Sequence, residues 1–206
     1  MRSAAIEPVS LPDSIGRDEL VWNFSYGSNM DRSKRTTRAN VVYLETAAAM
    51  VPGWRLSFDL PAIPRVEPAM ASIEPFAEAN SSVAIRGALD ANVVVHGLCL
   101  RMNRESFEKL YLSEGGQRGR YFIETVQAHL YADPENPVTA YAFRTKQKAR
   151  LRRSLPPSER YMSVILNGAR ESELNAEYQD YLASLPTTKV ILFVVLALIL
   201  LILSGG

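Results

Sequence analysis

The fold of this chain is most easily inferred from Leu20-Val-Trp-Asn-Phe-Ser-Tyr-Gly-Ser-Asn-Met30. Its first seven residues are rich in aromatic and β-branched side chains, which predicts a strand. Gly27-Ser-Asn interrupts that strand, and the polar run that starts at Asp31 and ends at Arg38 predicts a short helix. The sequence therefore predicts a strand, a tight loop and a helix in immediate succession.

Further strands are predicted downstream of this loop. They cover residues 41–50, 54–60, 93–101, 121–131 and 138–145, with turns at Pro52-Gly53 and at 133–137. The strand at 93–101 is apolar on both faces, which is typical of a central strand. Residues 61–90 are rich in Pro, Ala, Ser and Glu, and we interpret much of this run as a long surface loop with one possible short strand at 70–73.

Helices are predicted after the central strand and at the end of the domain. Asn103 is a suitable N-cap for a helix that places Phe107, Leu110 and Tyr111 on one face. Two more helices are predicted at 158–169 and 174–185. Because strands dominate the first two-thirds and no alternating βαβ pattern is found, we predict an α+β fold with a mixed or antiparallel, barrel-like sheet and flanking helices.

The composition restricts the kinds of ligand and site that this chain can have. With 23 Lys and Arg against 22 Asp and Glu, the formal net charge is +1, which gives no electrostatic footprint for nucleic acid. Cys99 is the only cysteine, so no intrachain disulfide can form, and its apolar surroundings predict a buried, inert thiol. His96 and His129 lack metal-ligand spacing, so we expect structural roles for them and no metal site.

We divide the 206 residues into a flexible N-terminal segment (1–19), one domain (20–186) and a hydrophobic C-terminal tail (189–204). The tail carries no charge after Lys189, which predicts a hydrophobic helix and favours a membrane anchor with the domain facing the cytoplasm. Its apolar run spans only about 21 Å as a helix, less than a typical bilayer core. A buried tail on a soluble cytoplasmic protein is therefore the alternative, and we expect a monomer or a dimer.

A basic cluster lies between the last predicted strand and the closing helices. It consists of Lys146, Lys148, Arg150, Arg152 and Arg153. Such clusters are usually solvated loops, although one beside a membrane tail could also favour an anionic lipid surface.

Two features could support chemistry. A glycine in the Tyr26-Gly-Ser-Asn29 loop lets the backbone turn sharply and approach a ligand, and N–H groups ahead of a helix form an anion site. Glu114 ends the predicted helix that starts after Asn103, and the negative end of the helix dipole disfavours its charge and so favours uptake of a proton. Either feature alone is weak, since ordinary turns and surface glutamates are common.

Several segments, in order along the chain, resemble the γ-glutamyl cyclotransferase family, also called AIG2-like. Residues 23–30 resemble its strand–loop signature, and 96–103 resemble its central strand. Ser113-Glu-Gly115, followed by Gly119-Arg-Tyr121, resembles the catalytic Glu-Gly and a downstream tyrosine. Residues 140–143 resemble the strand with another active-site tyrosine. The resemblance covers about 20–186, nearly the whole predicted domain.

This resemblance implies an enzyme that needs no metal or organic cofactor. Family members cyclise a γ-glutamyl group to 5-oxoproline and release an amine, amino acid or peptide. Glu114 would be the catalytic acid–base. The implied substrate-binding residues are Asn23, Phe24, Ser25, Tyr26, Gly27, Ser28, Asn29, Tyr141 and Tyr161.

Two questions stay open at this level. The substrate could be a small γ-glutamyl amino acid, a γ-glutamyl amine or a glutathione adduct of a secondary metabolite, and the long stretch between Asn29 and Glu114 leaves this choice undecided. The alternative to an enzyme is a catalytically inactive, membrane-tethered binding module on the same fold.

Overall fold

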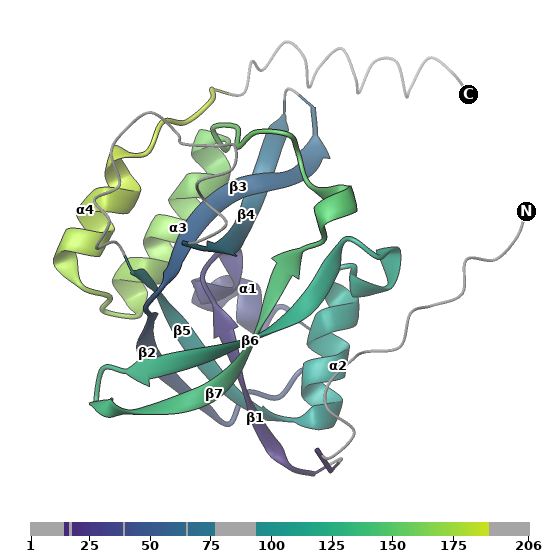
Figure 1. Cartoon of the computed structure of the whole chain (residues 1–206), viewed down its shortest axis with the longest axis vertical. Helices are drawn as coiled ribbons and strands as arrows, with labels where there is room; N and C mark the ends of the chain where they lie inside the picture. The colour runs from purple at the N-terminus through teal and green to yellow at the C-terminus, as the bar shows by residue number, and fades with distance from the viewer. Residues whose placement is uncertain (1–14, 17, 39, 65, 77–93, 190–206) are drawn as a thin grey trace, which may run out of the picture.

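The computed structural model describes residues 15–76 and 94–189, apart from Arg17, Ala39 and Arg65 (Figure 1). Its strands are β1 (Leu20–Ser25), β2 (Glu45–Val51), β3 (Trp54–Ile63), β4 (Glu67–Pro75), β5 (Val95–Asn103), β6 (Tyr121–Leu130) and β7 (Asp133–Thr145). Its helices are α1 (Arg32–Thr36), α2 (Arg104–Ser113), α3 (Glu159–Glu171) and α4 (Ala176–Ser184), with short 3-10 helices η1 (Ser28–Met30), η3 (Gly116–Arg118) and η4 (Gln147–Ala149).

Five strands form a closed barrel in the order β1-β5-β2-β6-β7. The pairs β1–β5, β5–β2, β2–β6 and β6–β7 are antiparallel, whereas β1 and β7 run parallel and close the barrel. The strands β3 and β4 form a separate two-stranded sheet above it (Figure 1). This arrangement confirms the predicted α+β fold with a mixed, barrel-like sheet.

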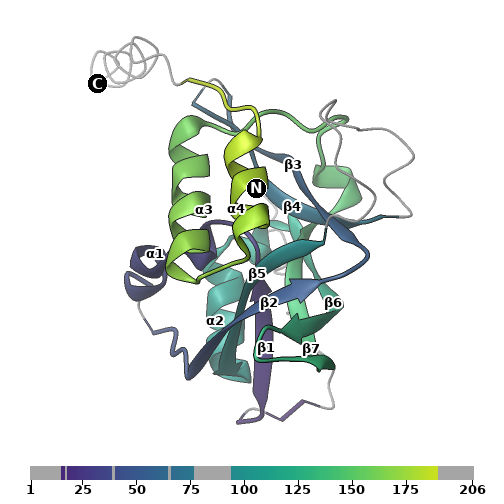
Figure 2. The same cartoon turned by 90° about the vertical axis from the view of Figure 1, so that its left-hand side faces the viewer.

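The predicted central strand is confirmed as β5. It pairs with β1 on one side and with β2 on the other. Leu98, Cys99 and Leu100 on β5 are all buried, although successive side chains point to opposite faces. Helix α2 packs against β5 and β1, and α3 and α4 pack against each other on another side of the barrel (Figure 2).

The helix after β5 also forms as predicted. The Asn103 side chain accepts a hydrogen bond from the Ser106 backbone N–H at 2.9 Å, which caps α2. Phe107 and Leu110 are fully buried, as their spacing on one helical face indicates. The helix ends at Ser113, and Glu114 is its C-cap.

The prediction of a surface loop over 61–90 is wrong where the structure describes it. Strand β3 continues to Ile63, and β4 adds nine residues, of which Ala69 and Ile73 are in the core. The composition misled us because β4 contains polar residues that are buried with partners. Glu67, for example, accepts a hydrogen bond from the Ser158 hydroxyl at 2.6 Å. Residues 77–90 lie outside the described residues.

The turn between the last two strands is also displaced from its predicted place. The sequence put it at 133–137, but Leu130 pairs with Asp133, so the turn lies at Tyr131-Ala132. Pro134 and Pro137 belong to the start of β7, where the side chains are exposed. Prolines are tolerated at this exposed end of the strand because they do not interrupt the buried part of the ladder.

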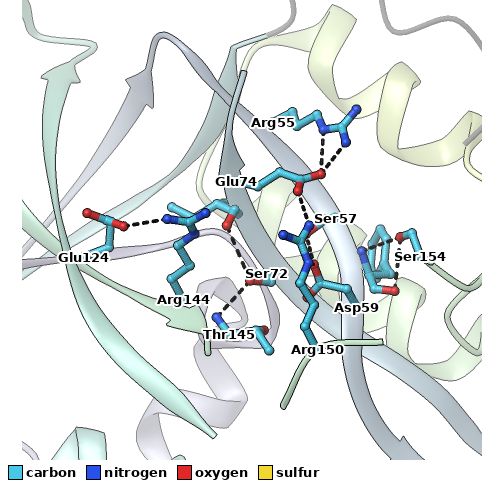
Figure 3. A network of polar contacts seen from close by, with 12 residues as sticks. Arg55, Ser57, Asp59, Ser72, Glu74, Glu124, Arg144, Thr145, Arg150 and Ser154 are labelled. Atoms are coloured by element: carbon cyan, nitrogen blue, oxygen red, sulfur yellow. Dashed lines mark hydrogen bonds and ion pairs between the residues drawn. The ribbon is translucent and has the colours of Figure 1, made fainter. Parts of the chain in front are cut away.

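A buried ionic network joins β3 and β4 to the segment after β7 (Figure 3). Arg150 Nε lies 2.6 Å from Asp59 Oδ2, and the same guanidinium pairs with Glu74, which also pairs with Arg55. Burial raises the pKa of Asp59, and Arg150 opposes this effect. The interpretation of the basic cluster as a solvated or lipid-facing surface is therefore wrong for Arg150, which points into the domain.

Helix α3 packs directly on the loop that follows β1. A Cβ atom at Gly168 would lie 2.5 Å from the Asp31 backbone nitrogen, so only glycine permits this approach. The described part of the N-terminal segment also packs on the domain, because Ile15 is buried and its carbonyl accepts a hydrogen bond from Arg104.

The predicted tail at 189–204 lies outside the described residues except for Lys189. Among residues 15–76 and 94–189, none of the helices has the length and apolar character needed to cross a membrane.

Candidate active site

The end of β1 lines a pocket in the domain. Its walls come from β1, η1, β4, α3, the C-cap of α2 and the adjacent strands β6 and β7. The lining residues are Asn23, Phe24, Ser25, Tyr26, Gly27, Ser28, Asn29, Met70, Ala71, Glu114, Tyr121, Phe143 and Tyr161. The structure thus brings together every predicted site residue except Tyr141.

Hydrogen bonds to β7 fix the loop at the end of β1. The Asn23 side-chain amide donates to the Tyr141 carbonyl at 2.8 Å, and its oxygen accepts from the Ser25 hydroxyl at 2.8 Å. The Tyr26 hydroxyl donates to the Phe143 carbonyl. Because these donors and acceptors are buried, they hold the loop in one position relative to the barrel.

Gly27 is required for space rather than for an unusual backbone conformation. Its φ is −122°, so the sharp turn that we expected from a glycine is not what this position needs. A Cβ atom at Gly27 would lie 3.2 Å from the Tyr161 hydroxyl and 3.4 Å from the Ala71 Cβ. The Tyr161 hydroxyl in turn accepts a hydrogen bond from the Ala71 backbone N–H at 3.2 Å. Gly27 therefore lets the loop backbone approach the wall formed by α3 and β4.

Glu114 reaches the pocket from the end of α2. Its backbone N–H donates to the Leu110 carbonyl at 3.0 Å, and its side chain is 15% exposed. Glu114 Oε1 pairs with Arg38, which also donates to the Asn29 side chain at 2.7 Å and contacts Ser113. The sequence argument considered only the helix dipole, and it did not include this counter-ion.

The phenols of the pocket are protonated at neutral pH. Burial raises the pKa of Tyr161 to about 12, and it also raises the pKa values of Tyr26 and Tyr121 well above the usual tyrosine range. These side chains are therefore hydrogen-bonding groups rather than bases. Among the lining residues that the structure describes, Glu114 is the one carboxylate.

Tyr141 lies on β7 two residues before Phe143, so both side chains are on the same face of this strand. Its ring packs edge-on against Phe107 of α2, with the ring centroids 6.0 Å apart, and it does not line the pocket. Phe143, two residues further along β7, lines the pocket instead. Tyr121 belongs to a segment that resembles the family. It also lines the pocket and lies on β6, the strand that pairs with β7.

Sequence reasoning missed four residues of this site. Met70 and Ala71 were missed because β4 was interpreted as mostly loop, and Phe143 because the neighbouring tyrosine attracted attention. Arg38 was assigned to a polar helix, and its pairing with a residue 76 positions away has no local signal. The one hint of this contact in the sequence was that basic residues closely follow the Tyr26–Asn29 loop.

The two histidines and the cysteine that the sequence analysis considered have structural roles. His96 contacts the Tyr131 hydroxyl, and His129 bonds to the Pro134 carbonyl at 2.7 Å. Burial raises the pKa of the Cys99 thiol to about 12, which agrees with an inert thiol. Within the described ranges, no group of three or more His, Cys, Asp or Glu side chains is placed to hold a metal ion.

Known proteins are similar to this chain in sequence and in fold. Residues 94–182 match the model of the AIG2-like family. The chain is 31% identical to γ-glutamyl cyclotransferase verK of Clonostachys rogersoniana, across 78% of this chain and 89% of that protein. This chain belongs to the γ-glutamyl cyclotransferase family.

A second relative in this family is γ-glutamyl cyclotransferase gliK of Aspergillus fumigatus, with 33% identity over 81% of this chain. The chain spans 62% of that relative's length, which is less than two thirds. A solved γ-glutamyl cyclotransferase structure superimposes with a TM-score of 0.64 at 21% identity, covering 82% of this chain and 90% of the other. That likeness supports the shared fold.

Proposed function

We propose that this protein is a γ-glutamyl cyclotransferase that converts a γ-glutamyl compound into 5-oxoproline and a free amine. The observation that carries the proposal is that the Tyr26–Asn29 loop and the Glu114 carboxylate line the same pocket. The loop provides backbone N–H groups for an anionic or polar group, and Glu114 provides the proton acceptor.

The first task of the pocket is to hold the substrate in a ring-like conformation. The α-amine of the glutamyl group attacks its own γ-carbonyl, so binding this flexible chain in a bent form removes much of the entropic barrier. The N–H groups of Gly27 and Ser28 would bind the γ-glutamyl group and stabilise the oxyanion of the tetrahedral intermediate. The hydroxyl groups of Tyr121 and Tyr161 would add neutral hydrogen bonds.

The second task is proton transfer. A free α-amine is mostly protonated at neutral pH, so Glu114 would first remove one proton from it. The neutral amine then forms the C–N bond of the lactam, and the bond between the γ-carbon and the leaving nitrogen breaks as Glu114 returns its proton to that nitrogen. The second proton lost by the attacking nitrogen is taken up by the released amine, so protons balance over the reaction.

Release of 5-oxoproline tests this proposal. The full-length protein would be incubated with γ-glutamylalanine, γ-glutamylbutylamine, glutathione and S-hexylglutathione, which represent the open substrate classes. We expect at least one to be cyclised, and Glu114→Gln to lower its turnover by at least about 100-fold, since general acid–base catalysis contributes about 10²–10⁴-fold. Near-normal turnover by this variant would contradict the role of Glu114, and no product from any of the four compounds would support the binding module.

We further propose that residues 190–203 attach the protein to a membrane. The support is the sequence alone, which has no charged side chain after Lys189. Attachment by apolar side chains should resist extraction by high salt, because salt screens charges and does not weaken hydrophobic contacts. Release of the protein from membranes by salt would contradict hydrophobic attachment.

A further inference from the structure

One guanidinium joins the two halves of the pocket. Arg38 Nη2 donates to Asn29 Oδ1 at 2.7 Å and contacts Glu114 Oε1, and Nη1 contacts the Ser113 hydroxyl. Asn29 belongs to the loop after β1, whereas Ser113 and Glu114 end α2. The Arg38 side chain is only 16% exposed, so these contacts are largely shielded from solvent.

The contact with Arg38 makes the two oxygens of Glu114 different. Oε1 is engaged by the guanidinium, while Oε2 has no hydrogen-bond partner within the described ranges. Glu114 lines the pocket, so the oxygen that is left over is the one available to a bound molecule. A carboxylate held at one oxygen has less rotational freedom, which is how a base is kept at a productive angle.

We propose that Arg38 is the positioning residue of this active site. It fixes Glu114 Oε1 and leaves Oε2 to exchange the proton with the substrate amine. It also fixes the position of Glu114 relative to the Tyr26–Asn29 loop. This inference rests on the proposed cyclotransferase function. Arg38 itself does not line the pocket, so it acts through Glu114 and Asn29 rather than on the reacting atoms.

The unsatisfied groups around Arg38 support a role beyond stability. Arg38 Nε and the Tyr43 hydroxyl are buried without a hydrogen-bond partner in the described part of the chain. A buried donor without an acceptor costs about 1–3 kcal/mol, so this arrangement is not the one that stability alone would favour. Such local compromises are typical of functional sites.

Arg38 is the charged neighbour of Glu114. Tyr43 before β2, Tyr121 on β6 and Tyr161 on α3 all interact electrostatically with Glu114, and burial raises the pKa of each, so they are neutral in the working pH range. Of these four neighbours Arg38 is the one that carries a charge, and it is the one that pairs with the Glu114 carboxylate.

The test uses three variants of the full-length protein. Arg38→Met removes the charge and the hydrogen bonds, and Arg38→Lys keeps the charge without the planar fork. Lys34→Met is the matched control, because Lys34 is an exposed cation on α1, four residues before Arg38, with no side-chain ion pair in the described part of the chain. The kcat and the KM would be measured with the best substrate among the four compounds named above.

We expect Arg38→Met to lower kcat at least ten-fold with a smaller change in KM. Arg38→Lys should restore kcat only partly, because it keeps the charge and lacks the planar fork, and Lys34→Met should match the unmodified protein. A folded Arg38→Met variant with a kcat within two-fold of the unmodified protein would overturn the proposal. So would a change in KM at least as large as the change in kcat, or a loss of activity in both Arg38 variants that only follows their loss of stability.

A thermal measurement separates this proposal from the proposed function. If Arg38 acts through Glu114, the loss of Tm caused by Arg38→Met should be smaller in a Glu114→Gln background than in the unmodified protein. Equal losses in the two backgrounds would overturn the coupling even in an active enzyme. A coupled pair in a protein that releases no 5-oxoproline would instead overturn the cyclotransferase function.

Discussion

Replacing Gly27 by valine tests the close approach on which the pocket depends. The first added carbon would lie 3.2 Å from the Tyr161 hydroxyl and 3.4 Å from the Ala71 Cβ, and both are buried. Two further methyl groups must then fit beside them or point into the pocket. Overpacking of this kind costs about 1–3 kcal/mol. If the cost falls on the bound state, this corresponds to a loss of substrate affinity of roughly 5- to 150-fold.

Steady-state kinetics of 5-oxoproline release and thermal unfolding would measure this loss. Gly27→Ala is the matched smaller change, and it should raise KM less than Gly27→Val. If contact with the Tyr161 hydroxyl is the cause, the double variant Gly27→Ala/Tyr161→Phe lacks the crowded oxygen. Its loss of substrate affinity and of stability should then be smaller than the sum of the losses in the two single variants. Unchanged KM and kcat in Gly27→Val would refute the reasoning, as would simple additivity in the double variant.

Three other changes have defined outcomes. Tyr161→Phe leaves the Ala71 backbone N–H without its acceptor, so the free energy of unfolding should fall by about 1–3 kcal/mol, seen as a lower Tm. Arg150→Met leaves Asp59 buried without its cation and should lower the free energy of unfolding by about 3 kcal/mol at pH 7. Burial raises the pKa of Asp59 in the folded state, so the free energy of unfolding falls as pH rises through that pKa. Urea titrations should therefore find a smaller difference in the free energy of unfolding between variant and unmodified protein at pH 4 than at pH 7. Cys99, whose pKa burial raises to about 12, should resist iodoacetamide at pH 8 until the protein unfolds, so rapid labelling of native protein would contradict the burial.

The parts of the fold that could be predicted are those with a local signal. Asn103 and the apolar spacing that follows it predict α2, and a run that is apolar on both faces predicts β5 as a central strand. The Tyr26–Asn29 loop and Glu114 were identified from the resemblance in addition to local pattern, and the structure places them on one pocket. The closed barrel was anticipated only as a class, because strand order depends on contacts between distant segments.

The parts that could not be predicted depend on partners that are distant in sequence. β4 contains Glu67 and Glu74, and it looks like a solvated loop until Ser158 and Arg150 are seen to satisfy these carboxylates. The contact of Arg38 with Glu114 likewise joins two segments that give no local indication of meeting. Even the choice between Tyr141 and Phe143, which lie on the same face of β7, depends on where along the strand the pocket lies, which a strand pattern does not specify.

The parallel pairing of β1 with β7 has a consequence for the order in which this protein can be made. Trp22 and Asn23 pair with Ala140 and Tyr141, so the first strand of the barrel cannot complete its pairing until the last strand has been synthesised. As the chain leaves the ribosome, the Tyr26–Asn29 loop has neither its β7 anchors nor the α3 surface at Gly168 until most of the domain has been synthesised. Contacts of such long sequence separation slow folding. The Tyr26–Asn29 loop is therefore synthesised early and fixed in place late, and a nascent chain halted before β7 would contain all of the loop's residues without the contacts that hold them.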